Sequence, residues 1–271
     1  MNKTVIKQGR NFFGNYSVDT HIGIRRLVHG NTSHGKQFID FRLRDIPLEY
    51  YHYNSPIGNA FSHLQFKCEK GVPSRNVAIL GLGVGQTLAY GDYNQNFDLF
   101  EINPAIIEIA KNRKYFTYLR NTKANYKIYQ GDARIEMKRH IRDNTYDLIL
   151  ADTFISDNIP THLITKEAIE LYLQKLKPDG VLVLHISSRF INLEPMLTKL
   201  VASIGGGVTA IVRDDKTGGV LDIYSSSYCV LIAKQDADLS YFDNLGWRKP
   251  QTNDFVKPWT DDYSNIIFSL F

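Results

Sequence analysis

The sequence predicts an α/β protein, in which a mainly parallel, Rossmann-like sheet with helices on both faces follows a small antiparallel β region. From residue 76 onward, short apolar runs alternate with helical segments, the pattern of strand–helix–strand units. Four glycine-rich or acidic motifs each directly follow one of these runs, where a parallel sheet presents residues to a ligand. Earlier segments are rich in Tyr, Phe, Val and Ile and are separated by Gly, Asn, His and Pro, which is typical of antiparallel strands.

The antiparallel region is predicted to occupy residues 1–70 as a small unit of its own. Strands are expected near 12–18, 23–29 and 37–41. The turn-forming stretch Ser55-Pro56-Ile57-Gly58 ends this region, and a helix is expected over 59–69. Residues 71–271 are predicted to form the larger domain.

Strands and helices of the larger domain follow from the same alternation. Strands are expected at 77–82, 97–102, 126–130, 146–151, 181–187, 208–212 and 227–233, and helices at 85–90, 104–111, 133–142, 165–176 and 193–204. Pro104 suits the first turn of its helix, and the hydroxyl of Thr165 can cap another. Near-continuous apolar strands indicate a sheet that is covered on both faces.

The composition argues against several classes of protein. The formal charge of +4 is small for 271 residues, and the basic residues form no run with aromatic residues between them, so we expect no nucleic-acid partner. No run reaches the roughly 18 apolar residues of a membrane span, and the first residues lack an apolar signal core. The two cysteines, Cys68 and Cys229, are far apart, so we expect no metal site and a reducing, cytoplasmic location.

The first motif, Gly81-x-Gly83-x-Gly85, joins a strand to a helix. Glycines at this turn allow a ligand close to the backbone and to the amides that begin the helix. Glu101 lies 20 residues after Gly81 (101 − 81), the offset at which an acid reaches ribose hydroxyls. Gln86 replaces the third glycine of a dinucleotide site, which favours a nucleoside without a pyrophosphate. The alternatives are a tight turn without a ligand and a solvated acid at a strand end.

Three further acids follow later strands. Asp132, just before Ala133, can accept the adenine amino group or cap the next helix, and both roles are compatible. Asp152 follows an all-apolar strand, where an apolar wall should raise the pKa of its carboxyl and suit it to general base catalysis. Asp157 lies on the following loop, as a second site acid or as part of a turn.

Residues 76–184 resemble the spermidine synthase (polyamine aminopropyltransferase) branch of the class I S-adenosylmethionine-dependent fold, the methyltransferase-type fold. The resemblance rests on the segments AILGLGVG at 78–85, FEINPA at 100–105, QGDAR at 130–134 and YDLILAD at 146–152. Gly35-Lys36-Gln37 before Tyr50-Tyr51 resembles the small β domain of that family. With His29-Gly30, His34-Gly35 and residues 157–160 and 259–263, the pattern is most similar to spermidine synthase-like domains often fused to transporter-like membrane segments.

The resemblance implies transfer of an aminopropyl group from decarboxylated S-adenosylmethionine to an amine acceptor, with release of methylthioadenosine. It implies a homodimer without a metal. Asp152 becomes the expected catalytic residue. The residues expected to bind the nucleoside are Gly81, Gly83, Gly85, Glu101, Asp132, Ala133 and Gln37, and those expected to bind the amine are Tyr51, Asp157, His185, Asp261 and Asp262.

Two positions depart from the family pattern. Val84 stands where the family has an acid that holds the ammonium of the decarboxylated donor, so we expect weaker discrimination against intact S-adenosylmethionine. Asp157 lies further from Asp152 than the second acid of the family's D-[ST]-x-D-P loop. The pair Asp261-Asp262, between aromatic residues, is the expected substitute for holding a cation, or else an exposed acidic turn.

Two other functions are compatible with the same motifs. One is a methyltransferase that uses intact S-adenosylmethionine, which Val84 favours. The other is a non-catalytic module that binds a nucleoside or a polyamine, against which Asp152 argues. His185, at the end of a strand, could orient the acceptor amine or be structural.

Overall fold

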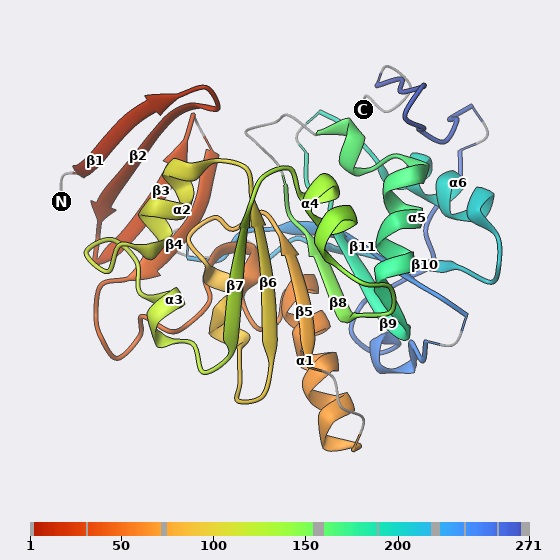
Figure 1. Cartoon of the computed structure of the whole chain (residues 1–271), viewed down its shortest axis with the longest axis horizontal. Helices are drawn as coiled ribbons and strands as arrows, with labels where there is room; N and C mark the ends of the chain where they lie inside the picture. Colours follow the sequence, from red (N-terminus) through yellow and green to blue (C-terminus); the bar gives the residue numbers. More distant parts are fainter. Residues whose placement is uncertain are drawn as a thin grey trace.

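The computed structural model describes residues 3–30, 32–71, 75–153, 160–188, 190–217, 223–235, 237–253 and 255–266, which form two sheets (Figure 1). The small sheet is antiparallel, in the order β1 (Thr4–Asn11), β2 (Gly14–His21), β3 (Ile24–His29) and β4 (Thr32–Phe38). The large sheet has the order β10-β11-β9-β8-β5-β6-β7. Its strands are β5 (Asn76–Leu80), β6 (Asn96–Glu101), β7 (Asn125–Gln130), β8 (Tyr146–Ala151), β9 (Leu176–His185), β10 (Thr209–Asp215) and β11 (Ser227–Ala233).

The large sheet confirms the predicted fold class. Strands β5 to β9 run parallel, and β11 is antiparallel to both of its neighbours. The chain leaves β5 toward β6 and β7 on one side and returns to β8 and β9 on the other, so the order reverses between β5 and β8. In a doubly wound sheet, ligands bind outside the carboxyl ends of the strands at this reversal.

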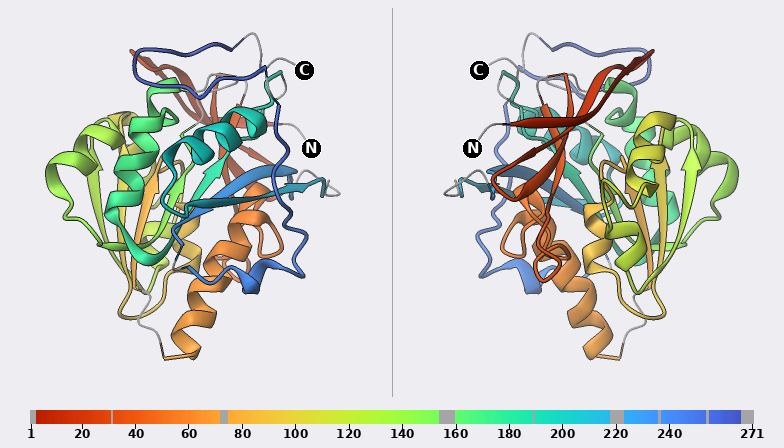
Figure 2. Two further views of the ribbon diagram at one scale, coloured as in Figure 1. Left: turned by 90° about the vertical axis from the view of Figure 1, so that its right-hand side faces the viewer. Right: turned by 90° about the vertical axis from the view of Figure 1, so that its left-hand side faces the viewer.

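Helices cover both faces of the large sheet (Figure 2). On one face, Ala78 and Leu80 of β5 pack in a cluster with side chains of α4 (Ala133–His140), α5 (Lys166–Lys175) and α6 (Glu194–Ile204). On the other, Val77 and Ile79 pack with α1 (Pro56–Glu69). Because alternate residues of a strand face opposite sides, one apolar run serves both layers.

Helix α1 belongs with the large sheet, since its residues Ile57, Phe61 and Leu64 are buried in the same cluster as β5. We therefore propose that the larger domain begins at Pro56 rather than at residue 71. Two other helices complete the β5–β7 side, α2 (Pro104–Lys111) and the single-turn α3 (Tyr118–Asn121). Short 3₁₀ helices lie at η1 (Glu49–Tyr51), η2 (Gln86–Tyr90), η3 (Thr161–Leu163) and η5 (Ser240–Phe242). None of the helices within the described ranges has the length and hydrophobicity of a membrane span.

Several elements differ from the sequence expectations. Strand β1 was not predicted, because most of its residues are exposed and carry no apolar alternation. Strand β9 begins at Leu176, before the predicted strand at 181–187, and includes Lys177-Pro178-Asp179-Gly180, where the register with β8 is irregular. The helix expected at 85–90 is the 3₁₀ helix η2 rather than an α-helix.

The side chain of Val84 joins the glycine turn to the small sheet by apolar packing. Its side chain is 1% exposed and packs in a cluster with Val18 and Leu27 of the small sheet. Gly35 of β4 leaves room for it, since a Cβ atom on Gly35 would overlap the Val84 side chain. An apolar residue at this position therefore has a packing role, whatever an acid does there in other proteins.

This packing predicts that Val84→Asp lowers the free energy of unfolding by about 3–5 kcal/mol, because it buries a carboxylate without a partner. Val84→Ala, which removes apolar contacts without adding charge, should cost about 1–3 kcal/mol. Urea unfolding of the three proteins measures both. An Asp variant as stable as the wild type would show that the side chain can reach water, contrary to this packing.

Candidate active site

A cavity of about 520 Å³ opens at the carboxyl edge of the large sheet, between that edge and the small sheet. Its size suits a small-molecule ligand. Residues that end or directly follow five parallel strands contribute to the wall, namely Gly81 after β5, Glu101 at the end of β6, Asp132 after β7, Asp152 after β8 and His185 at the end of β9. The small sheet and η1 close the other side with His29, Thr32, Ser33, His34, Glu49, Tyr50 and Tyr51.

The glycine turn needs its glycines because other backbone segments approach it closely. Gly81 has a φ of +97°, and a Cβ there would overlap the carbonyl oxygen of Asp152. Gly83 has a φ of +52°, and a Cβ there would lie 2.7 Å from the carbonyl oxygen of His34. Side chains are disfavoured on both counts. The turn is thus held between β8 of the large sheet and β4 of the small one.

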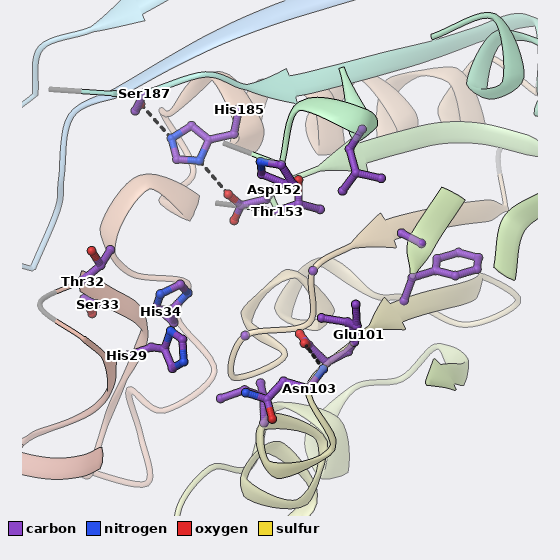
Figure 3. Close-up of a pocket in the computed structure, with 18 of the residues that line it drawn as sticks. His29, Thr32, Ser33, His34, Glu101, Asn103, Asp152, Thr153, His185 and Ser187 are labelled. Carbon is purple, nitrogen blue, oxygen red and sulfur yellow. Dashed lines mark hydrogen bonds and ion pairs between the residues drawn. The ribbon is translucent and has the colours of Figure 1, made fainter. Parts of the chain in front are cut away.

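The carboxylate of Glu101 is tied to this turn. It accepts hydrogen bonds from the amide of Leu82 (3.1 Å) and from the amide of Asn103 (2.8 Å). Burial raises the pKa of the Glu101 carboxyl, and the surrounding backbone amides oppose that rise. The carboxylate also lines the cavity (Figure 3), so it is placed where the sequence predicts an acceptor for ribose hydroxyls.

Asp132 both caps a helix and lines the cavity, as the sequence allows. One carboxylate oxygen accepts the amide of Ile135 at 3.0 Å in the first turn of α4, and the other lies 2.7 Å from Nε2 of His162. Its neighbours Ala133 and His162 line the cavity with it. Contact with an adenine amino group stays a prediction for Asp132.

Asp152 is the most constrained acid of the cavity. Its Oδ1 lies 2.7 Å from Nδ1 of His185, and its Oδ2 accepts the hydroxyl of Tyr51 (Figure 3 shows the first contact). Burial alone would raise the pKa of this carboxyl, but His185, the hydroxyl of Tyr51 and His34 together hold it below the usual value. The expectation of a raised pKa for the Asp152 carboxyl is therefore wrong. The apolar strand before Asp152 gives no sign of the polar groups that contact this carboxyl, because they come from other parts of the chain.

His185 continues the chain of contacts away from Asp152. Its Nε2 lies 2.8 Å from Oγ of Ser187, which in turn accepts the backbone amide of Tyr228 at 2.8 Å. The ring of Tyr50 lies against the His185 ring, with 4.5 Å between centroids. Sequence reasoning missed Tyr50 and Ser187, although Ser187 could have been found, since residues two apart along an extended chain face the same side.

The small sheet and η1 supply two histidines and an acid to which sequence reasoning gave no role in the site. The rings of His29 and His34 meet edge to face at 5.5 Å. Burial, with the neighbouring His29, lowers the pKa of His34 to about 4, against the pull of Asp152. Glu49 is 2% exposed, pairs with Lys36 at 3.3 Å and has a pKa raised by burial. The family pattern includes His29-Gly30 and His34-Gly35 but gives the two histidines no role, and no motif includes Glu49, because these residues reach the cavity only through the packing of the two sheets.

Four predicted binding residues do not line the cavity. The amide group of Gln37 is bonded to the amide of Thr117 and the carbonyl of Arg44. Gly85 packs against Leu119. Asp261 forms a two-point ion pair with Arg134, at 2.7 Å for each contact, and Asp262 is exposed. Asp157 lies outside the described residues.

Among the described residues, no three His, Cys, Asp or Glu side chains are grouped so as to hold a metal ion. The cavity walls carry hydroxyls, imidazoles and carboxylates. These groups can bind an uncharged or cationic organic molecule and exchange protons with it.

Comparisons with known proteins agree with the geometry. No protein-family model matches the chain. Over 111 residues, the chain is 37% identical to the polyamine aminopropyltransferase of Vibrio vulnificus (strain CMCP6), which covers 40% of this chain and 36% of that protein. The match thus spans little more than a third of the curated relative.

Solved structures match over nearly the whole chain. A probable spermidine synthase from Corynebacterium glutamicum ATCC 13032 superposes with a TM-score of 0.70, at 12% identity, over 96% of this chain and 97% of that one. Spermidine synthase from Thermotoga maritima gives 0.60 at 14% identity, over 93% and 81%. Spermidine synthase in complex with the transition state analogue AdoDATO gives 0.57 at 14% identity, over 93% and 81%. Together the matches confirm the resemblance to the spermidine synthase-like family and the fold that it implies.

The contacts of Asp152 predict that Tyr51→Phe raises the pKa of its carboxyl. The Tyr51 hydroxyl stabilises the ionised carboxylate, so without it protonation becomes easier. A carbon-13 NMR titration of the aspartate carboxyls would follow this shift. Tyr53→Phe, which changes an exposed ring near the same segment, is the matched control. An unaltered Asp152 titration in Tyr51→Phe would rule out this hydrogen bond.

Proposed function

We propose that this chain is an aminopropyltransferase, which moves an aminopropyl group from decarboxylated S-adenosylmethionine to an amine acceptor and releases methylthioadenosine. One observation carries the proposal. The glycine turn is bonded to Glu101 through Leu82 and packs against Asp152 through Gly81. A nucleoside whose ribose lies on Glu101 would therefore place its sulfur beside the carboxyl end of β8 and the polar groups around Asp152.

The reaction needs alignment more than charge stabilisation. The nitrogen of the acceptor attacks the carbon next to the sulfonium, the carbon–sulfur bond breaks, and its electron pair stays on sulfur as a neutral thioether. Since the charge on sulfur disappears, the main task of the site is to hold nitrogen and carbon in line. The attacking nitrogen must also be free of its extra proton, and Asp152 with its partners faces that point of the cavity.

Choice of donor is the finer part of the proposal. The name of the Vibrio relative and the transition state analogue bound to one structural neighbour support the decarboxylated donor. Methyl transfer from intact S-adenosylmethionine is the second candidate, favoured by the absence of an acid in the glycine turn, where Val84 is buried. We also propose an amine as the acceptor, a homodimer as the assembly and the cytoplasm as the location.

The masses of the products test the function directly. The chain is incubated with each donor and a panel of mono-, di- and polyamines, and the products are weighed by mass spectrometry. Aminopropyl transfer gives methylthioadenosine and an acceptor heavier by one aminopropyl group. A methylated acceptor with S-adenosylhomocysteine would establish the second candidate instead. Binding of either donor with no product in any pairing would indicate a non-catalytic module.

Glu101→Gln should weaken binding of methylthioadenosine by about 1.5–3 kcal/mol, the range for a hydrogen bond to a charged group. The amide keeps the shape of the side chain and removes its charge. Isothermal titration calorimetry gives the affinities, and Glu108→Gln, an exposed position on α2, is the control. Equal affinities for the Glu101 variant and the wild type would remove Glu101 from the ribose site.

Asp152→Asn should lower kcat by about 10²–10⁴-fold, the usual contribution of acid–base groups, with nucleoside binding little changed. The resemblance assigns Asp262 to amine binding, and in that role Asp262→Asn would raise the KM for the amine. Because Asp262 is exposed and does not line the cavity, we now expect its kcat and KM to match the wild type. Steady-state kinetics with the amine varied would decide, and a rise in KM for Asp262→Asn would restore its binding role.

A further inference from the structure

We propose that His185, reached through the hydroxyl of Ser187, holds the proton that the attacking group gives up, while Asp152 stays ionised and positions the imidazole. The inference rests on the proposed function for the identity of the attacking group. It deepens that function by assigning the proton to a histidine rather than to the aspartate.

The oxygens of Asp152 are already engaged. Oδ1 faces Nδ1 of His185 at 2.7 Å, and Oδ2 accepts the hydroxyl of Tyr51. Hydrogen bonds that stabilise a carboxylate also make it a weaker base. An aspartate bound in this way is suited to fixing its neighbours, as the buried aspartate of a serine protease triad does.

The hydrogen bonds determine the tautomer of His185. An ionised carboxylate can only accept, so Nδ1 of His185 carries the proton that Asp152 receives. In the neutral ring, Nε2 then holds a lone pair, and the partner at 2.8 Å, the hydroxyl of Ser187, donates to it. The Ser187 oxygen accepts the amide of Tyr228 as well. The result is a directed chain from Ser187 through His185 to Asp152 (Figure 3).

The packing around His185 holds the hydrogen-bond chain in place and leaves its Ser187 end open to the cavity. His185 lies at the end of β9, opposite Cys229 of β11, and its side chain is 6% exposed beneath the ring of Tyr50. Ser187 is partly exposed and lines the cavity. A nucleophile in the cavity therefore reaches the Ser187 hydroxyl more readily than either nitrogen of the imidazole.

The proton transfer balances without an additional reactant. The N–H of the acceptor ammonium gives its proton to Oγ of Ser187 as the hydroxyl proton moves to Nε2 of His185, which forms an imidazolium paired with Asp152. The freed nitrogen lone pair forms the carbon–nitrogen bond, the carbon–sulfur bond breaks, and its electrons remain on sulfur. The imidazolium returns its proton to solvent through Ser187 after the product leaves.

Nitrogen-15 NMR of the histidine rings tests the chain without turnover. At neutral pH the proposal requires His185 to be neutral and protonated at Nδ1, and Asp152→Asn to change that preference. A His185 protonated at Nε2 in the wild type would overturn the proposal. If the chain transfers nothing to any amine, the proposed function fails, but this NMR measurement still tests the tautomer of His185.

Steady-state kinetics test the same hydrogen-bond chain, from Ser187 through His185 to Asp152, during turnover. His185→Ala and Ser187→Ala should each lower kcat by about 10²–10⁴-fold, with unchanged affinity for methylthioadenosine by calorimetry. Added imidazole should restore part of the rate of His185→Ala and none of that of Ser187→Ala. Ser240→Ala removes an exposed hydroxyl that does not line the cavity and should behave as the wild type.

The pH profile separates proton transfer from a structural role. The wild-type kcat should rise with pH as the imidazole loses its proton, and this rise should be absent in His185→Ala. The titratable groups next to His185 are Asp152 after β8, Tyr50 of η1 and Cys229 of β11, and Tyr51 and His34 act on Asp152 in turn. His34→Gln should keep the rise, since the His34 ring is neutral through this range. A His185→Ala enzyme with wild-type kcat and pH profile would disprove the relay.

Discussion

The close approach of two backbone segments to one glycine turn determines the geometry of the whole site. Gly81 lies against the carbonyl of Asp152 after β8, and Gly83 lies against the carbonyl of His34 in β4. A side chain at either glycine would push the small sheet or β8 away from the turn. Since Glu101 is bonded to the same turn, the positions of Glu101 and Asp152 relative to one another depend on their contacts with the backbone of this turn.

Compensation of buried charge is the second constraint. Glu49, Glu101 and Asp152 are removed from water at the cavity wall, which is costly for carboxylates without partners. A different group compensates each carboxylate: a lysine pairs with Glu49, backbone amides bond to Glu101, and an imidazole and a phenol contact Asp152. Only the last combination contains an imidazole, a side-chain type that often takes up and releases protons in enzyme sites. The chemistry is therefore expected at Asp152, and ligand binding at Glu101.

Local sequence was sufficient for features that depend on one strand and the turn after it. Apolar runs located the strands of the large sheet, and their carboxyl ends located Glu101, Asp132 and Asp152 at one cavity. The direction in which the Val84 side chain points could not be predicted, because it follows from the packing of the small sheet on the turn. Asp261 is bound by Arg134, far away in the sequence, and Gln37 by Thr117, so neither motif showed that its side chain was already engaged.

The central claim is that a nucleoside lies along the carboxyl edge of the large sheet, with its ribose on Glu101 and its sulfur beside Asp152 and Ser187. A crystal structure of the chain with methylthioadenosine tests it most directly. Our account predicts both ribose hydroxyls within hydrogen-bonding distance of the Glu101 carboxylate and the methylthio group facing the Asp152–His185–Ser187 chain. A nucleoside bound outside this cavity, or one whose ribose faces the small sheet with Glu101 still bonded only to the backbone, would contradict it.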